Sequence, residues 1–409
     1  MERSRASILL PLLSLLAVIA GGIFLSTHWR TAVLYPQAQG EATSSTAAAQ
    51  STSSNGVVFQ PKPQNGENVK GIYLNEYIAD SGSQEAVAAR QHIDSLLDTT
   101  ELNAVVIDIK EVNGPYLPSS LKNYIKELHD RNVWVIARIC VFRDSSQLKT
   151  HPGWYIETKD DNGNLIPWKD SGGGYWLDPA GSAAQNYVIN FAKQAINYGF
   201  DELQFDYVRF PSDGDVSDAI YPFYDSSQQE KYQVIGGFFS AASHSLRSYD
   251  PNIILSADLF GYVASYQNAY TIGQRTYDAA QDFDYISYML YPSHFYSGFE
   301  ASRDDKRGLP GVSLPYKSDD LSSVVSNNPY LVIARSLFSA EDYLEQIKSD
   351  AKIRPWLQDF DLAADTSRGI YYDATKVREE INAAEESGAS GWLLWDPAGE
   401  YTEAALNKP

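Results

Sequence analysis

Eight short apolar segments, nearly all separated by amphipathic stretches, constrain this fold more than any other feature of the chain. The apolar segments are residues 69–74, 103–109, 132–139, 202–208, 252–259, 284–290, 353–358 and 391–395. Helices are predicted over residues 84–97, 121–131, 182–198, 230–249, 329–348 and 375–387. Near-continuous apolar strands that alternate with helices indicate a parallel sheet covered by helices. Eight such units predict a closed (β/α)8 barrel, the TIM barrel of the α/β class.

A doubly wound open sheet is the structural alternative to the barrel. Such sheets often bind nucleotides through a glycine-rich loop after the first strand. The sequence contains neither GxGxxG nor a P-loop, so nothing supports a nucleotide-binding version.

The N-terminus predicts an exported protein. Arg3 and Arg5 precede an uncharged apolar stretch of 19 residues, from Ile8 to Ser26, and a membrane-spanning helix needs roughly 20. The length favours an uncleaved signal anchor within residues 1–30 over a cleaved signal peptide, whose apolar core is usually about 7–15 residues. Positive charge before the segment predicts a cytoplasmic N-terminus. We therefore expect a single-pass protein of the cell membrane with an extracytoplasmic C-terminal domain; the alternative is secretion after signal cleavage.

Residues 31–66 are predicted to form a linker. The Ala/Ser/Thr-rich run at 42–55 has no apolar period and cannot build a core. The barrel is then expected over residues 67–409, a length that exceeds the roughly 250 residues of a typical barrel and implies long βα loops. Loops are expected at 140–181, 209–229 and 291–328, and long loops inside a compact domain are usually functional.

Composition excludes several classes of function. The chain has 52 acidic and 32 basic residues, a formal charge of −20, which argues against nucleic-acid binding. Its six histidines are scattered, and there is no HExxH or CxxC motif, so no metal or other cofactor is predicted. The single cysteine, Cys140, allows no intrachain disulfide and is expected to be buried.

Polar side chains gather where the predicted strands end. In barrel enzymes the catalytic groups lie at these carboxyl ends. The candidates are Asp108, Lys110, Arg138, Gln204, Asp206, Arg209, Asp258, Tyr288, Tyr291, His294, Gln358 and Trp395, with Trp176 added from the loop at 140–181. Because side chains alternate along a strand, Asp108 and Lys110 are expected on one face, as are Gln204 and Asp206. Isolated charge inside a barrel is costly, so these groups indicate a site rather than filling.

Two carboxylates that face one pocket are what glycoside hydrolysis requires. Asp206 is the candidate nucleophile because the nearby cations Arg209, Arg138 or Lys110 favour an ionised carboxylate. Asp258 is the candidate acid and base because it lies among apolar residues, which favour the neutral form. The remaining candidates are assigned to substrate binding.

Structural interpretations of the same residues remain open. Asp206 is alternatively a partner of Arg209 or Arg138 in an ion pair, Asp258 a helix cap, and Asp108 a partner of Lys110. Trp176 either stacks on a sugar or packs the loop, and His294 either contacts a sugar hydroxyl or braces its loop. Asp284 begins its strand and is interpreted as structural, whereas Asp396 before Pro397 is either a turn residue or part of the strand-end site.

Five segments together resemble the bacterial family described as the putative glycosyl hydrolase domain, number 4015 among the domains of unknown function. They are residues 103–114, 174–211, 283–295, 353–360 and 391–397, and the resemblance covers nearly all of residues 67–409. The family is distantly similar to α-amylase-type barrel glycosidases. That similarity implies a nucleophile at the fourth-strand aspartate, Asp206. The chain departs from the amylase pattern in having Gln204 for an arginine, Asp258 for a glutamate acid, and Gln358-Asp359 near the place of Asn-His-Asp.

These features predict a membrane-anchored glycoside hydrolase or transglycosylase that acts on extracytoplasmic or cell-wall polysaccharide. The expected partners are the polysaccharide and, through the N-terminal helix, the membrane; no nucleic acid and no obligate protein partner is predicted. A non-catalytic carbohydrate-binding barrel at the cell surface is the competing prediction. Polysaccharide deacetylation is a third and weaker prediction, because the sequence lacks a cluster of metal ligands.

Overall fold

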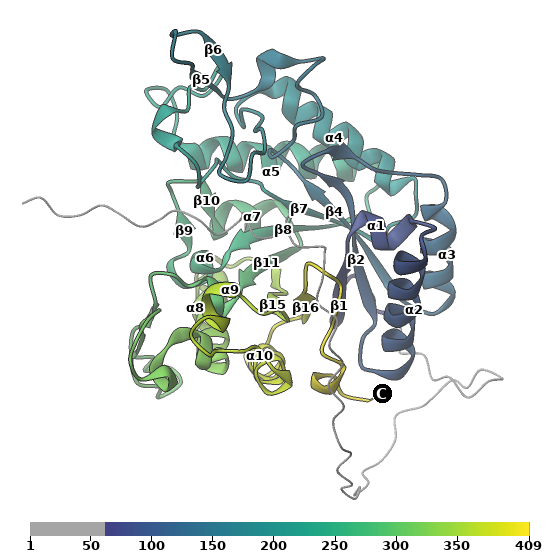
Figure 1. Ribbon diagram of the computed structural model, residues 1–409, viewed down its shortest axis with the longest axis vertical. Helices are drawn as coiled ribbons and strands as arrows, with labels where there is room; N and C mark the ends of the chain where they lie inside the picture. Colours follow the sequence, from purple (N-terminus) through teal and green to yellow (C-terminus); the bar gives the residue numbers. More distant parts are fainter. Residues whose placement is uncertain (1–61, 409) are drawn as a thin grey trace, which may run out of the picture.

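Eight parallel strands close into a barrel in the computed structural model, which describes residues 62–408 (Figure 1). In spatial order they are β1 (Val69–Leu74), β2 (Ala104–Glu111), β4 (Trp134–Cys140), β7 (Glu202–Asp206), β8 (Ile254–Phe260), β11 (Tyr285–Leu290), β15 (Trp356–Gln358) and β16 (Gly391–Trp395). Strand β1 pairs with β2 on one side and β16 on the other, so the sheet has no open edge there. The predicted barrel is confirmed, and the open doubly wound sheet is wrong.

Helices surround the barrel, as Figure 1 shows. The six predicted helices are present as α2 (Gln84–Thr99), α3 (Leu121–Asp130), α4 (Ser182–Ile196), α5 (Lys231–Tyr249), α8 (Pro329–Ile347) and α10 (Ala374–Glu386). Side-chain caps set two of the starts: Ser83 accepts the N–H of Ala86 before α2, and Asp373 accepts those of Thr375 and Lys376 before α10. Helix α7 (Thr276–Asp282) was not predicted, because seven residues are too few for a clear period.

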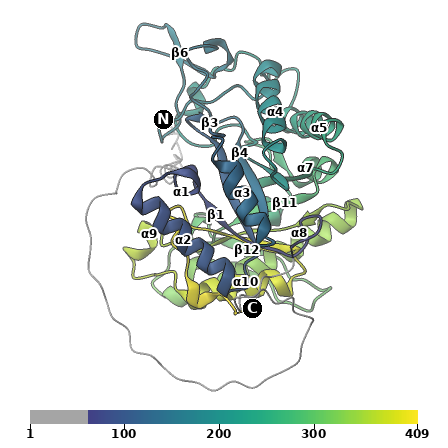
Figure 2. The ribbon, with the colours of Figure 1, turned by 90° about the vertical axis from the view of Figure 1, so that its right-hand side faces the viewer.

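Shorter elements occupy the connections. They are the helices α1 (Glu76–Asp80), α6 (Gly261–Tyr266) and α9 (Ala363–Thr366), and the strands β3 (Gly114–Pro115), β5 (Glu157–Lys159), β6 (Leu165–Pro167), β9 (Asn268–Ala269), β10 (Gln274–Arg275), β12 (Phe299–Ala301) and β13 (Val312–Leu314). The β5–β6 hairpin lies far from the barrel strands in both Figure 1 and Figure 2. The loop at 141–181, which carries this hairpin, connects the carboxyl end of β4 to α4.

The seventh strand of the barrel is interrupted. Its first part, β14 (Lys352–Ile353), pairs with β11 before β15 does. Arg354 and Pro355 separate the two parts, and proline has no N–H to give to the ladder. The break places Trp356 inside the barrel, where it is 1% exposed.

Two apolar clusters hold the fold together. One lies between the strands and the surrounding helices. The other fills the barrel interior and comprises Val69, Tyr73, Ala104, Val106, Trp134, Ile136, Tyr291, Trp356 and Leu393. Gly71 makes room for this filling, since a Cβ at that position would lie 2.7 Å from Cδ2 of Leu393.

The predicted signal anchor and most of the predicted linker lie outside the described residues. Within residues 62–408, no helix is long and apolar enough to cross a bilayer. The last residues assigned to the linker contact the barrel, because Nζ of Lys62 lies 2.7 Å from Oδ1 of Asp201.

Candidate active site

Arg138 occupies the carboxyl end of the barrel and is surrounded by four carboxylates. Its Nη1 donates to Oδ1 of Asp108 at 2.5 Å and also to Glu111. Its Nη2 donates to Oδ2 of Asp206 at 2.5 Å, and its Nε lies 3.9 Å from Oδ2 of Asp258. We call these five residues the acid cluster.

The strand register brings the acid cluster together. Asp108 of β2 is paired with Arg138 of β4, which is paired with Gln204 of β7. Asp206 follows two residues later on β7, so its side chain points to the same interior as Gln204. Asp258 enters from the neighbouring strand β8. The predicted convergence of strand-end carboxylates is thus present at the carboxyl end of the barrel.

Asp206 is held by N–H donors on both oxygens. Oδ2 accepts Nη2 of Arg138 at 2.5 Å and Nε at 3.2 Å, and Oδ1 accepts the backbone N–H of Tyr207 at 2.6 Å. Tyr207 has a φ of 54°, an uncommon left-handed conformation for a residue other than glycine. Both oxygens of Asp206 therefore act as acceptors in these contacts. Arg209 makes no ion pair with Asp206, so that structural alternative is wrong, whereas the pair with Arg138 does form.

Asp258 has the opposite surroundings. Its side chain is 1% exposed, Oδ1 accepts Nε1–H of Trp356 at 2.9 Å, and Oδ2 receives no hydrogen bond within the described residues. Burial raises the pKa of Asp258 well above its usual range, and the charge of Asp206 adds to the rise. Asp258 is therefore suited to hold a proton at neutral pH. It caps no helix, since α6 begins after Phe260, and the capping alternative is wrong.

A nitrogen atom near both candidate catalytic carboxyl groups sets an upper limit on the distance between them. Nε of Arg138 lies 3.2 Å from Oδ2 of Asp206 and 3.9 Å from Oδ2 of Asp258. The two oxygens cannot be further apart than these distances added together. This limit includes the roughly 5–5.5 Å of retaining glycosidases and ends near the low edge of the roughly 6.5–9.5 Å of inverting ones.

Negative charge exceeds positive charge in the acid cluster. Among the described residues, Arg138 is the only cation within ion-pair distance of Asp108, Glu111, Asp206 or Asp258. Burial raises the pKa of Asp108 to about 8, and its Oδ2 accepts the hydroxyl of Tyr73. Burial thus favours the protonated form of Asp108, as it does for Asp258.

Aromatic side chains border the acid cluster. The rings of Tyr73 and Trp395 are 4.1 Å apart, and the guanidinium of Arg138 lies 5.2 Å from the centre of the Trp395 ring. Tyr291 is also beside the carboxylates: burial raises its pKa well above the usual range, and the charges of Asp258 and Asp206 raise it further. Glu111, with a side chain 26% exposed, and the half-buried Trp395 are the parts of this region that reach solvent most. The side chain of Asp206 is 8% exposed.

Lys110 is not on the face predicted for it. A β-bulge between Asp108 and Lys110 pairs Lys110 with Ile139, which reverses the expected alternation. Nζ of Lys110 lies 2.8 Å from Oδ2 of Asp144, both side chains are 0% exposed, and the ammonium is near the ring of Tyr187 on α4. Lys110 therefore pairs with Asp144 rather than with Asp108, as a buried brace outside the acid cluster.

Two other predicted contacts point away from the acid cluster. Tyr288 lies on the outer face of β11, with its hydroxyl 2.9 Å from Oγ1 of Thr276 on α7. Trp176 is 0% exposed and donates its Nε1–H to Asp170 at 2.8 Å within the loop at 141–181. Both side chains pack the structure, which corrects their assignment to substrate binding.

The remaining predicted residues brace the site. Gln204 lies beneath Asp206 and donates to Ser287 at 3.1 Å, while its Oε1 is unpartnered in the described chain. Gln358 donates to Oγ of Ser293 at 2.9 Å. Arg209 is 2% exposed, with its guanidinium 4.9 Å from the ring of Trp176, and so contacts the loop.

His294 packs within the loop after β11, and two further acids make structural contacts. Contact of His294 with a sugar hydroxyl stays a prediction. The His294 ring packs 5.4 Å from the ring of Tyr291, and burial lowers the pKa of His294 to about 4. Asp284 pairs with Arg247 at 3.0 Å at the amino end of β11, as predicted. Asp396 accepts the N–H groups of Ala398 and Glu400 in a turn, which favours the structural one of its two interpretations.

Three members of this region were missed from the sequence. Glu111 follows the bulge in β2, Tyr73 is near the end of β1, and Trp356 follows the break in the seventh strand. Tyr73 and Trp356 carried no signal that distinguishes them from core aromatics. Glu111 directly follows Lys110 at the predicted end of the second strand. This position among charged residues is the sequence signal that could have identified it.

Two surface hollows of the described chain lie away from the acid cluster. One is between the β9–β10 hairpin and α8, and the other is at the amino end of the barrel beside Asp284 and Lys352. Within residues 62–408, no group of three or more His, Cys, Asp or Glu side chains is arranged to hold a metal ion.

Comparison with known proteins gives a family and a fold. The sequence profile of the family described as "Putative glycosyl hydrolase domain" matches residues 116–401. None of the curated proteins matches the chain. A hypothetical protein from Ruminiclostridium thermocellum ATCC 27405 is 30% identical over 46% of this chain and 96% of its own, with a TM-score of 0.37.

Two solved structures share the fold. The PgaB (BpsB) glycoside hydrolase domain from Bordetella bronchiseptica is 14% identical, with a TM-score of 0.55 over 81% of this chain and 94% of its own. The β-galactosidase from the psychrophilic Marinomonas ef1 is 10% identical, with a TM-score of 0.52 over 82% of this chain and 58% of its own. At these identities the similarity concerns the barrel alone.

Proposed function

The chain belongs to the family described as the putative glycosyl hydrolase domain, and from this membership we propose that its acid cluster hydrolyses glycosidic bonds of a polysaccharide. One observation carries the proposal. Two carboxyl groups of contrasting surroundings, Asp206 and Asp258, lie around one nitrogen of Arg138 at the carboxyl end of the barrel. A pair of acids whose environments differ in this way supplies both a base or nucleophile and an acid.

Asp206 is the proposed nucleophile and Asp258 the proposed acid and base. Asp206 faces the anomeric carbon as a carboxylate, and Asp258 protonates the leaving oxygen as the bond breaks. A retaining mechanism is proposed, because the upper limit set by the shared nitrogen includes the roughly 5–5.5 Å of retaining enzymes and excludes most of the roughly 6.5–9.5 Å of inverting ones. Retention also allows transglycosylation, when a sugar hydroxyl replaces water in the second step.

Arg138 has a positioning part in this mechanism. Its two bonds to Oδ2 of Asp206 fix that oxygen, so the lone pair left for attack is on Oδ1, which within the described residues accepts only the N–H of Tyr207. The uncompensated negative charge of the acid cluster favours the positive charge that develops on the sugar ring in the transition state. Trp395 and Tyr73 offer aromatic surface beside these groups.

A polysaccharide panel with matched variants tests the proposal. The full-length wild type, Asp206→Asn, Asp258→Asn and Asp284→Asn are incubated with soluble and insoluble glycans, and the products are separated and sized. Asp284 is the control because it is an aspartate at the opposite end of the barrel. We expect new reducing ends from the wild type and from the control, and a loss of about 100-fold or more in the two catalytic variants. Cleavage by Asp206→Asn at the wild-type rate would overturn the assignment.

Non-catalytic carbohydrate binding is the second candidate. The observation that favours it is the enclosure of the acids, since the side chains of Asp206 and Asp258 are 8% and 1% exposed. A wild type that binds a glycan of the panel without cleaving it would favour this candidate.

We also propose that the barrel is displayed outside the cytoplasm through residues 8–26, the charge-free apolar stretch that follows Arg3 and Arg5. Protease added to intact producing cells should then remove the barrel while a cytoplasmic marker protein survives. Protection of the barrel until the cells are lysed would contradict this location.

A further inference from the structure

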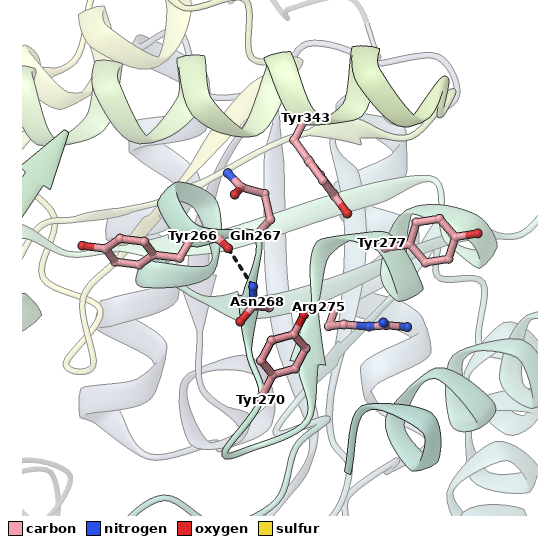
Figure 3. Close-up of a pocket in the computed structure, with 7 residues that line it drawn as sticks. All are labelled: Tyr266, Gln267, Asn268, Tyr270, Arg275, Tyr277 and Tyr343. Atoms are coloured by element: carbon pink, nitrogen blue, oxygen red, sulfur yellow. Dashed lines mark hydrogen bonds between the residues drawn. The ribbon is translucent and has the colours of Figure 1, made fainter. Parts of the chain in front are cut away.

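One of the two surface hollows is lined mainly by aromatic side chains and lies on the loop that follows β8. It has a volume of about 390 Å³ and is lined by Tyr266, Gln267, Asn268, Tyr270, Arg275, Tyr277 and Tyr343. Figure 3 shows Tyr343 reaching down from α8 toward the hairpin that carries Tyr270 and Arg275, with the ring of Tyr277 to one side. We propose that this hollow is a secondary binding site for a short stretch of neutral glycan.

Exposed aromatic surface is the first argument. Tyr270 is 57% exposed and Tyr277 is 42% exposed, and Tyr343 is half-buried above them. Leaving several large rings in water around one concave place is costly unless a ligand covers them. A tyrosine ring presents a flat apolar face to the C–H groups of a sugar and a hydroxyl to its oxygens.

Two amide side chains of the hollow are oriented by hydrogen bonds and, in the described part of the chain, keep a free acceptor oxygen. Asn268 donates its amide to the carbonyl of Tyr266 at 2.9 Å, and Gln267 donates to Oγ of Ser339 at 2.9 Å. The side-chain oxygens of Asn268 and Gln267 receive no hydrogen bond within residues 62–408. Oriented amides with a free acceptor are suited to sugar hydroxyls, which both donate and accept.

The charge of the hollow argues for a neutral ligand. Arg275 is the only cation of the lining, and its Nε and Nη2 are bound to the carboxylate of Asp278 at 2.7 and 2.5 Å. Its guanidinium carbon also lies over the ring of Tyr232, 3.8 Å from the ring centre. Because the positive charge is already compensated, an anionic ligand gains little there. The volume is at the small end of the roughly 300–1,000 Å³ of ligand pockets, which fits a short segment of glycan.

One buried side chain connects the hollow to the acid cluster. Gln274, next to Arg275 and 1% exposed, accepts the N–H of Phe260 at 3.0 Å and donates to the carbonyl of Asp258 at 3.3 Å. The hollow is thus anchored on the end of β8, although no side chain of the acid cluster lines it. This placement suits a site that holds a polymer near the place of cleavage. The choice of glycan as ligand rests on the proposed function.

Binding measurements in an inactive background test the inference. Full-length Asp206→Asn is compared with the same chain carrying Tyr270→Ala and Tyr277→Ala, or Tyr249→Ala as the control. Tyr249 is 49% exposed at the end of α5, at the other end of the barrel. The probes are insoluble cellulose, chitin, xylan and starch in pull-down assays, with thermal unfolding to show that each variant is folded.

We expect at least one polymer to bind Asp206→Asn and the control alike, with a loss of tenfold or more in the double tyrosine variant. Equal binding by all three proteins would overturn the inference, as would binding of none of the four polymers. The outcome is separable from the fate of the proposed function. If binding depends on the two tyrosines but the wild type cleaves no glycan, the proposed hydrolase is wrong and the binding site stands. If the wild type cleaves a glycan but binding does not depend on the tyrosines, the hydrolase stands and the binding site is wrong.

Discussion

Replacing Arg138 by methionine should destabilise the folded protein strongly at neutral pH. Arg138 is the cation for Asp108, Glu111 and Asp206 and also lies 3.9 Å from Asp258. Removing one partner from a buried ion pair leaves an uncompensated charge, which costs about 3–5 kcal/mol. Here several carboxylates lose the same partner, so we expect the free energy of unfolding to fall by at least that amount.

The loss of unfolding free energy caused by Arg138→Met should be smaller at acidic pH. Without the guanidinium, the folded-state pKa values of the clustered carboxyls rise above the unfolded values of about 4. Between the unfolded and the folded pKa values, the folded variant binds more protons than the unfolded variant. Its free energy of unfolding therefore rises as the pH falls through this range. Burial already raises the pKa of Asp108 to about 8 in the wild type, a shift in the same direction as the one expected in the variant. Urea unfolding followed by fluorescence at pH 7.5 and pH 5.5 measures the difference.

Arg303→Met provides the matched control. Arg303 pairs with Asp305 on the surface, where the two side chains are 71% and 84% exposed, and such pairs contribute about 0–1 kcal/mol. A loss below about 1 kcal/mol for Arg138→Met would refute the reasoning, because the acids would not depend on that cation. A loss that is unchanged between the two pH values would refute the coupling to protonation.

Three further outcomes are expected from other buried groups of the barrel. Trp356→Phe removes the donor to Asp258 and should lower the free energy of unfolding by about 1–3 kcal/mol in urea titrations; no loss would show that water replaces the bond. Lys110→Met leaves Asp144 buried without its partner and should cost about 3–5 kcal/mol, seen as a lower thermal midpoint. The pKa of His294 is lowered to about 4 by burial, so the unfolded chain takes up a proton first as the pH falls. The wild type should therefore lose stability between about pH 6.5 and 4 more steeply than His294→Gln, and parallel curves would contradict this.

The barrel was predictable because its signal is repeated. Every predicted strand is present within a few residues, since apolar runs between helices leave few alternative arrangements. The failures are local. Helix α7 is too short for a visible period, and Arg354-Pro355 divides the seventh strand at a point where the sequence shows only one apolar run.

The site was predictable only to the level of strand ends. Asp108, Arg138, Asp206 and Asp258 converge because register is set by the strands that carry them. Lys110 was misplaced because a single bulge inverts every side chain beyond it, and a bulge leaves no mark in the composition of the strand. Partners that come from distant loops, such as Asp144, cannot be assigned by alternation along one strand.

The two ends of the barrel interior show why the acid cluster is interpreted as a site rather than as filling. At the amino end, Glu202 pairs with Arg354 and also accepts Nε1–H of Trp134 at 3.0 Å, so one carboxylate meets one guanidinium in full enclosure. At the carboxyl end, Arg138 alone serves four carboxylates. In a balanced pair the attraction offsets part of the desolvation cost, whereas burial of an excess of acid raises the pKa of Asp108 and Asp258. Stability gains nothing from that arrangement, but a reaction that needs a carboxylate beside a carboxylic acid requires it.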